Sequence, residues 1–232
     1  MSYYLVLAII SAVLGLFQLG VNASSMNQPQ SVIEEFLYEA FMKRYGSELT
    51  PELTSTYFSF AVTIFSVGGM IGALSAGQMA ENLGRRNALL YAQSFSFLGA
   101  ILQGCCKYAL SYEMLLLGRL SAGVANGVLE GLSTLYLVEI APTHIRGAIG
   151  TFNALGYTIG ILTGTVLGLS NILGNEDTWP VLLALPIVPS TFQVLILPFM
   201  PETPRYLLIS KRKISEAQEA LMKLVVSFIE FK

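Results

Sequence analysis

The sequence predicts an all-α membrane protein, built as a six-transmembrane-helix bundle with a cytoplasmic amphipathic helix after it. Hydrophobic residues make up 53% of the chain and charged residues only 12%, whereas a soluble domain carries about 25% charged residues. A membrane span with its connection needs roughly 35 to 40 residues, so a chain of 232 residues provides about six spans. The net charge of -2 argues against a nucleic-acid partner.

Six apolar stretches are the candidate spans. Five of them contain no charge, namely residues 2–19, 53–80, 87–104, 147–175 and 178–201. The remaining stretch, 114–140, is apolar but contains Arg119, Glu130 and Glu139. Each stretch is expected to be helical, because the bilayer core offers backbone polar groups no water. A cleaved secretory signal is the alternative for the first stretch, but that stretch lacks a basic leading region and its apolar run is longer than usual.

The basic residues predict the orientation, since Lys and Arg in short loops tend to stay in the cytoplasm. With the amino end inside, nine basic residues lie on the cytoplasmic side, and only Lys43, Arg44 and Lys107 lie outside. We therefore expect an integral protein of the plasma membrane with both termini cytoplasmic. The expected organisation is a transmembrane bundle over residues 1–201, with an external loop at 27–53, followed by a cytoplasmic helical segment at 202–232 that leads to a second bundle.

Two segments outside the spans carry apolar residues at helical spacing. In the external loop they predict a short helix that serves as a lid or spacer over the mouth; these residues are Val32, Ile33, Phe36, Leu37, Ala40 and Phe41. In the segment 202–232, an apolar stripe from Ala217 to Phe228 follows the basic residues 211–213. This second helix suits anionic lipid and a cytoplasmic partner surface equally well, because both require one apolar face.

Ordered glycines and isolated polar residues occur together in the spans. Glycines recur every four residues at 156–168, at 123–131 and at 68–72, and such ridges let helix backbones approach closely. The polar residues are Gln18 and Asn22, Asn126 and Glu130, and Asn153 and Thr158. Each alone is typical of a hydrogen bond between helices. Together they predict a polar path lined by the first, fourth and fifth spans, because polar groups at membrane depth normally face a bundle interior or a wet cavity.

Glu130 has the most specific implication of these residues. A carboxylate at mid-depth costs roughly 3 kcal/mol or more. Arg119 lies too far along the same helix to pair with it, at about 16 Å by helical rise, whereas Asn126 is one turn away. A bound proton, a bound cation and a polar substrate group all stay open as the partner of Glu130.

Four motifs stand at or near the ends of the spans, three of them on the expected cytoplasmic side and Gly118-Arg119 at the start of the fourth span. They are Gly77-Gln78-Met79-Ala80-Glu81-Asn82-Leu83-Gly84-Arg85-Arg86, Gly118-Arg119, Glu139-Ile140-Ala141-Pro142-Thr143-His144-Ile145-Arg146-Gly147 and Pro201-Glu202-Thr203-Pro204-Arg205. In this order and placement, the set resembles the sugar porter branch of the major facilitator superfamily. It is most similar to the N-terminal six-helix half of an animal facilitative glucose transporter, and the resemblance covers nearly the whole chain.

The resemblance implies half of a twelve-helix major facilitator fold. In that fold two six-helix bundles surround a central sugar site and alternate between outward-open and inward-open forms. The resemblance also implies a cytoplasmic gating network of salt bridges, formed here by Arg85, Arg86, Glu139, Arg146, Glu202 and Arg205.

The substrate-binding residues expected from the polar pattern and the resemblance are Gln18, Asn22, Glu130, Asn153, Tyr157 and Thr158. The family's sugar-binding Gln in the fifth span is Ala154 here, and its cavity Thr in the fourth span is Glu130. Amides beside an aromatic surface suit a hexose or a similar polyol. Asn22 stands where proton-coupled relatives often carry Asp, which favours facilitative uniport by this chain as the N-terminal half of a transporter.

Two other functions stay open. One is a truncated, non-transporting membrane protein that binds or regulates full-length carriers, and the other is proton-coupled sugar symport through Glu130. The expected partners are a hexose-class small molecule, the lipid bilayer, and a C-terminal transporter half or a full-length carrier. We predict no enzyme and no cofactor, because the spans show no paired carboxylates, metal cluster or nucleophile beside a histidine, and the adjacent Cys105 and Cys106 have no metal-ligand spacing.

Overall fold

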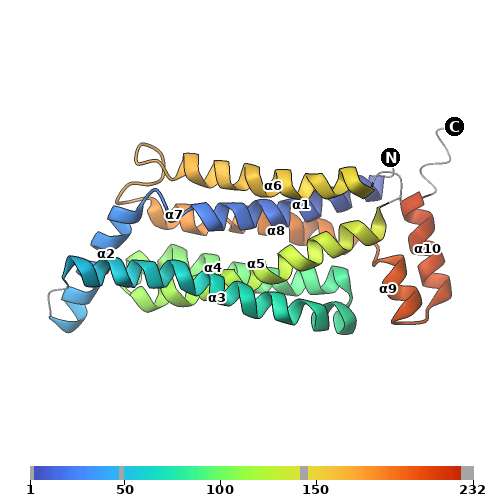
Figure 1. The fold of residues 1–232 in the computed structure, drawn as a ribbon, viewed down its shortest axis with the longest axis horizontal. Helices are drawn as coiled ribbons and strands as arrows, with labels where there is room; N and C mark the ends of the chain where they lie inside the picture. Colours follow the sequence, from blue (N-terminus) through green and yellow to red (C-terminus); the bar gives the residue numbers. More distant parts are fainter. Residues whose placement is uncertain (1–2, 47–49, 142–145, 226–232) are drawn as a thin grey trace.

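The computed structural model describes residues 3–46, 50–141 and 146–225, and in these ranges every regular element is a helix. The elements are α1 (Tyr3–Ser24), α2 (Gln30–Tyr45), α3 (Pro51–Leu83), α4 (Arg85–Ala109), α5 (Tyr112–Ile140), α6 (Arg146–Leu167), α7 (Trp179–Ala184), α8 (Ile187–Ile196), η1 (Leu197–Phe199), α9 (Pro204–Ile209) and α10 (Ile214–Val225). The long helices run side by side as one bundle (Figure 1). Helix α2 lies at one end of the bundle, and α9 and α10 lie at the other end, next to the start of α1 (Figure 1).

Four segments of the described chain are long and apolar enough to cross a membrane: α1, α3, α4 and the stretch Trp179–Phe199. The other two long helices, α5 and α6, have 29 and 22 residues. Both are long enough for a span, since about 20 residues suffice. Six spans in total therefore stay a prediction, whereas the all-α architecture is confirmed.

The last two expected spans differ from continuous helices of the predicted length. Helix α6 ends at Leu167 and a compact turn follows, in which the Leu173 amide donates to the Leu167 carbonyl at 3.0 Å. The stretch 178–201 is interrupted between Ala184 and Ile187. Pro186 stands in this interruption, and a proline lacks the N–H that an α-helix needs and clashes with the preceding turn.

The glycine ridges bring helix backbones into contact, as predicted. On α6, a Cβ at Gly160 would overlap the carbonyl oxygen of Phe17 in α1 and would lie 3.1 Å from the Cα of Gly20. On α5, a Cβ at Gly123 would lie 3.1 Å from the Cα of Gly68 in α3. Close approach of this kind substitutes van der Waals packing for the hydrophobic drive that lipid cannot supply. The ridges therefore join α1 to α6 and α3 to α5.

The helix predicted in the segment 27–53 is present as α2, and it packs onto one end of the bundle, whereas its external position stays a prediction. Ile33, Phe36 and Leu37 of α2 are buried in one apolar cluster that includes Phe58 of α3 and Trp179 of α7. The Phe36 and Trp179 rings lie 5.2 Å apart, within the range of favourable aromatic pairs. Function as a lid stays a prediction for this helix.

Candidate transport site

Gln18 lies inside the bundle, where its side-chain amide is held by two other helices. Its Nε2 donates to the Ser96 hydroxyl of α4 at 2.5 Å, and its Oε1 accepts from the Ser190 hydroxyl of α8 at 2.8 Å. The residue is 0% exposed. Both hydrogen-bonding atoms are therefore occupied within the protein, as burial of an amide requires.

A second buried polar group lies between α4 and α8. The Gln93 side chain donates to the Gln193 amide oxygen, and Gln193 Nε2 donates to the Ser11 backbone carbonyl of α1 at 2.9 Å. We did not identify these residues, or Ser96 and Ser190, as candidates from the sequence. The available indication was the presence of amides and hydroxyls in the third and sixth apolar stretches.

Arg119 connects the end of α1 to α5. Its Nη1 donates to the backbone carbonyl of Asn22 at 3.1 Å, and its guanidinium lies 4.5 Å from the ring centroid of Phe65 in α3. Arg119 is 2% exposed and Asn22 is 1% exposed. The Asn22 side chain donates back to the Gln18 carbonyl at 3.2 Å. The backbone carbonyl and the side-chain amide of Asn22 are thus both hydrogen-bonded inside the bundle, and the residue is buried.

The other predicted substrate residues lie where α5 and α6 meet. Glu130, Tyr157 and Thr158 are exposed, Tyr157 at 37%, whereas Asn153 is buried. The Asn153 side-chain amide donates to the Thr134 hydroxyl at 3.2 Å, and that hydroxyl donates to the Glu130 backbone carbonyl at 3.0 Å. This relay attaches α6 to α5 one turn beyond Glu130. Glu130 on α5 and Tyr157 and Thr158 on α6 are exposed polar residues on the two helices that this relay joins, and we call these three residues the α5–α6 face.

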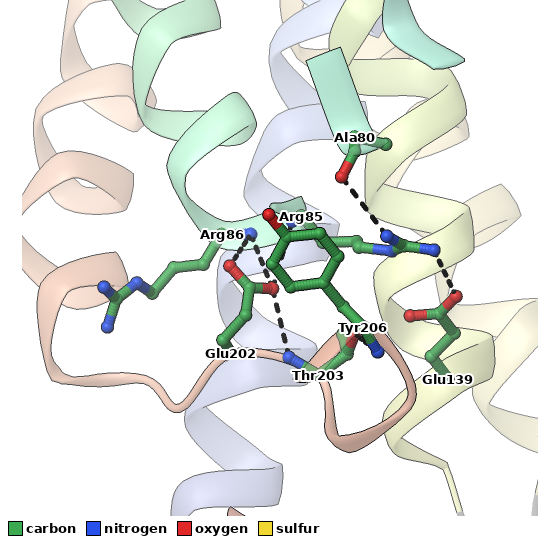
Figure 2. A network of polar contacts seen from close by, with 7 residues as sticks. All are labelled: Ala80, Arg85, Arg86, Glu139, Glu202, Thr203 and Tyr206. Carbon is green, nitrogen blue, oxygen red and sulfur yellow. Dashed lines mark hydrogen bonds and ion pairs between the residues drawn. The ribbon is translucent and has the colours of Figure 1, made fainter. Parts of the chain in front are cut away.

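At the end of the bundle where α9 and α10 lie, Arg85 forms an ion pair with Glu139, and both residues belong to the predicted gating network (Figure 2). Its Nη2 lies 3.0 Å from Oε1 of Glu139, and the two side chains are only 12% and 2% exposed. Arg85 also donates to the Ala80 carbonyl at 3.2 Å and lies over the Tyr206 ring at 5.1 Å from its centroid. This arginine joins the start of α4 to the end of α5 and to α9.

Glu202 has a different role from the expected salt bridge. Its carboxylate accepts from the backbone N–H groups of Arg85 at 3.0 Å, Arg86 at 3.2 Å and Thr203 at 3.0 Å (Figure 2). Helix α4 follows Gly84, which has no side chain to satisfy the free amides of the first turn. Glu202 therefore caps α4 from a position far along the sequence.

Arg86 and Arg205, two further residues of the predicted gating network, form no ion pair with any residue that the structure describes. The Arg86 side chain extends away from Glu202 and donates to the Met200 carbonyl at 3.0 Å (Figure 2). Arg205 is exposed, and the side chain of Arg146 lies outside the described part of the structure. Tyr206, which we did not identify from the sequence, is buried and donates to the Asn82 carbonyl at 3.3 Å. An aromatic residue in the turn after Pro204 was the available indication.

Comparison with known proteins assigns the family. The family model described as "Sugar (and other) transporter" matches residues 7–227. Facilitated glucose transporter member 1 of Gallus gallus is 45% identical over 97% of this chain and 46% of its own length. Member 4 of Homo sapiens is 45% identical over 95% of this chain and 44% of its own length. The chain thus spans about half the length of these curated relatives.

Solved structures agree with the fold. A structure of the proton:xylose symporter XylE bound to 6-bromo-6-deoxy-D-glucose has a TM-score of 0.82, with 23% identity over 96% of this chain and 50% of that chain. A partially occluded inward-open XylE of E. coli has a TM-score of 0.78 at 22% identity, over 97% of this chain and 56% of that chain. The chain belongs to the sugar porter branch of the major facilitator superfamily, and it corresponds to the N-terminal half of these transporters.

Proposed function

We propose that this chain forms the N-terminal half of a transport pathway for a hexose or a similar polyol, working by alternating access as a facilitative uniporter in the plasma membrane. The observation that carries the proposal is the α5–α6 face, which consists of exposed polar side chains on two largely apolar helices. Glycine-mediated packing and the buried amides of α1, α4 and α8 hold this surface in place. Polar groups converging on a largely apolar, pre-formed site are typical of sugar recognition.

We assign two roles to the six predicted substrate residues. Glu130, Tyr157 and Thr158 contact the sugar, because they are exposed on the α5–α6 face. Gln18, Asn22 and Asn153 are buried and position the helices that carry the face. Buried, satisfied amides suit that second role, since each would leave an unpaired group if the helix shifted.

The cytoplasmic contacts support alternating access. Arg85, Glu139 and Glu202 join α4, α5 and the segment after the sixth span within a small, partly dehydrated region (Figure 2). Ion pairs and caps at helix ends form when the cytoplasmic surfaces close and break when they part. We propose that both termini lie on this side, which agrees with the start of α1 and α10 lying at the same end of the bundle (Figure 1).

Transport is tested by reconstitution of this chain in liposomes, alone and together with the C-terminal half of a relative. We expect saturable uptake of radiolabelled hexose that unlabelled hexose competes, and faster exchange when the lumen is preloaded. Glu139→Gln, which breaks the ion pair with Arg85, is expected to lower the rate of exchange. Absence of saturable uptake in both preparations would contradict the transport function and would favour a protein that only binds or regulates full-length carriers.

Proton coupling is a second mode of transport that one observation favours, namely that the Glu130 carboxylate is exposed and makes no ion pair with any described residue. A coupled carrier would acidify the lumen as sugar enters, and Glu130→Gln would abolish that proton flux. We expect no sugar-dependent proton flux in either form, because the proposed mechanism is uniport. A flux that is lost in the variant would show symport.

A further inference from the structure

We propose that the end of the bundle at α2 binds the headgroup of a zwitterionic phospholipid, whose ammonium group enters an acidic cavity beside Trp179. The cavity measures about 280 Å³ and is lined by residues of α2, the end of α4 and the start of α7. This lining shares no residue with the α5–α6 face, so the inference does not depend on the proposed function.

The lining of the cavity carries an excess of negative charge. Glu35 and Glu39 of α2 and Glu176 before α7 contribute carboxylates, and Lys107 of α4 contributes an ammonium group. Lys107 is already engaged, because its Nζ donates to the Glu176 backbone carbonyl at 2.5 Å and to Asp177 Oδ1 at 3.4 Å. No residue that the structure describes donates to the side chains of Glu35, Glu39 or Glu176 or forms an ion pair with them. The cavity therefore offers negative charge and acceptor atoms to a cation.

The cation that suits this cavity is larger than a metal ion. Among the described residues, no three acidic, histidine or cysteine side chains lie close enough to hold a metal ion together. Aromatic rings complete the lining: Phe36 packs on Trp179 with ring centroids 5.2 Å apart, and Tyr108 is 84% exposed. Carboxylates beside aromatic rings suit an organic ammonium group, because an aromatic face also attracts a cation.

Trp179 gives an independent indication of a ligand. It lines the cavity although it is 1% exposed, and its indole N–H donates to none of the described residues. Unlike the unpartnered Gln103 Oε1, which is sealed inside the bundle, Trp179 borders a space of ligand size. An indole nitrogen can only donate, and a buried donor normally has an acceptor. The ligand is therefore expected to carry an acceptor next to its ammonium group, as a phospholipid headgroup does with its phosphate.

A basic cavity adjoins the acidic one. It measures about 420 Å³, is lined by Lys43 and Arg44 of α2, and shares Tyr108 and Leu110 with the acidic cavity. Arg44 is paired with Glu113, whereas Lys43 makes no ion pair with any described residue. A headgroup that carries an ammonium group and a phosphate a few bonds apart complements both cavities at once. A cation without an anionic group would leave the basic cavity unused.

The exposed face of α4 indicates that the headgroup belongs to a lipid. Leu98, Ile101 and Tyr108 are exposed and lie on one face of this helix, at intervals of three and seven residues. An exposed apolar face of a membrane span is expected to contact acyl chains. This face ends at Tyr108, which lines both cavities, and tyrosine is enriched at the level of lipid headgroups. An acyl chain that lies along α4 therefore brings its headgroup to the cavities.

The test uses the fluorescence of Trp179, which is the single tryptophan of the chain and so reports on this cavity directly. The chain in detergent micelles is titrated with short-chain lipids that differ only in their headgroups. Dihexanoyl phosphatidylethanolamine and dihexanoyl phosphatidylcholine carry the cationic nitrogen, whereas dihexanoyl phosphatidylglycerol keeps the phosphate without it. Ethanolamine phosphate carries the ammonium group and the phosphate without acyl chains.

Two variants separate the carboxylates of the cavity from general acidity. The combination of Glu35→Gln, Glu39→Gln and Glu176→Gln removes the carboxylates of the lining at nearly constant volume. Glu52→Gln is the matched control, because Glu52 is exposed in the first turn of α3 and does not line the cavity.

The readout is the ratio of zwitterionic-lipid to phosphatidylglycerol affinity, so a general weakening of binding cancels. We expect both zwitterionic lipids to shift the Trp179 emission saturably and to bind about fivefold or more tightly than phosphatidylglycerol, the ratio that one or two exposed ion pairs provide. The ratio is expected to fall to near one in the triple variant and to stay unchanged in Glu52→Gln. Ethanolamine phosphate is expected to bind more weakly than either zwitterionic lipid.

Four results would overturn the inference. Equal affinity for phosphatidylglycerol would assign binding to the phosphate or the acyl chains, and a preference that persists in the triple variant would assign it to another group. Equal affinity for ethanolamine phosphate would indicate a site for a soluble amine instead of a lipid. An emission that none of the titrants changes would exclude a headgroup from this cavity. None of these results depends on sugar uptake, so failure of the inference and failure of the proposed function are distinguishable.

Discussion

The cap that Glu202 places on α4 makes a quantitative prediction. Gly84 precedes the helix with a φ of +93°, and a Cβ there would lie 3.0 Å from Glu202 Cδ. The carboxylate therefore takes the place that a capping side chain at residue 84 would fill. Glu202→Gln keeps the size of the side chain and one acceptor oxygen. It removes the negative charge of the group that accepts hydrogen bonds from the Arg85 and Arg86 backbone amides.

The expected loss follows from the type of bond. A hydrogen bond to a charged group contributes about 1.5–3 kcal/mol, against about 0.5–1.5 kcal/mol for a neutral pair. A negative charge at a helix N-terminus adds about 0.3–1 kcal/mol through the helix dipole. Because Glu202 is half-buried and partly screened, we take the lower part of the sum, about 1–2 kcal/mol. That range corresponds to roughly a 5- to 30-fold change in the opening equilibrium of the first turn.

Hydrogen exchange at the Arg85 and Arg86 amides measures this opening directly. We expect exchange roughly 5- to 30-fold faster in Glu202→Gln and faster still in Glu202→Ala, which removes both acceptors. Arg205→Gln removes a charge from the same segment, where Arg205 is exposed, and it should leave these amides unchanged. Equal exchange in wild type and both Glu202 variants would refute the cap. An effect reproduced by Arg86→Gln would indicate an ion pair between side chains instead.

Two further perturbations test the packing and the ion pair. Gly160→Ala in α6 is expected to lower the thermal unfolding temperature markedly, because its Cβ meets the α1 backbone, whereas Gly150→Ala on the same helix meets no atom within 4 Å and should have little effect; similar losses in both variants would contradict the close approach. Glu139→Gln is expected to cost about 3 kcal/mol of stability, because it leaves Arg85 buried beside a neutral side chain. A change in the midpoint of denaturant unfolding reports this loss, and no change would show that water already screens the pair.

The sequence predicted the helices well where a bilayer imposes them. Uncharged stretches near the length of a span can only be helical in lipid, and the first four long helices appear over the expected residues. The prediction was less accurate toward the end of the chain. Helix α6 ends at Leu167, and Pro186 interrupts the last span. Both departures occur at turns. Mean hydropathy does not predict such turns, because it contains no information about local hydrogen bonds.

The candidate site could be predicted only in part. Spacing placed Gln18 and Asn22 on one helical face, because residues four apart lie above one another. It did not show that this face would be turned toward Ser96 and Ser190 in other helices, where the Gln18 amide is fully used. Whether a polar side chain meets a ligand or another helix depends on rotation of the helix about its axis, which the packing decides.

The sequence by itself determined three things about this protein. Its composition determined the class of protein, the order of its motifs determined the family, and its glycines, which have no side chain, determined where helices approach closely. Only the tertiary structure decided which groups meet. It paired Arg85 with Glu139, directed Glu202 to backbone amides of α4, and left the Glu130 carboxylate exposed and unpaired among the residues that the structure describes. The physical reason is that every residue offers backbone donors and acceptors, so a carboxylate's partner is chosen by proximity in the folded bundle, which no local pattern specifies.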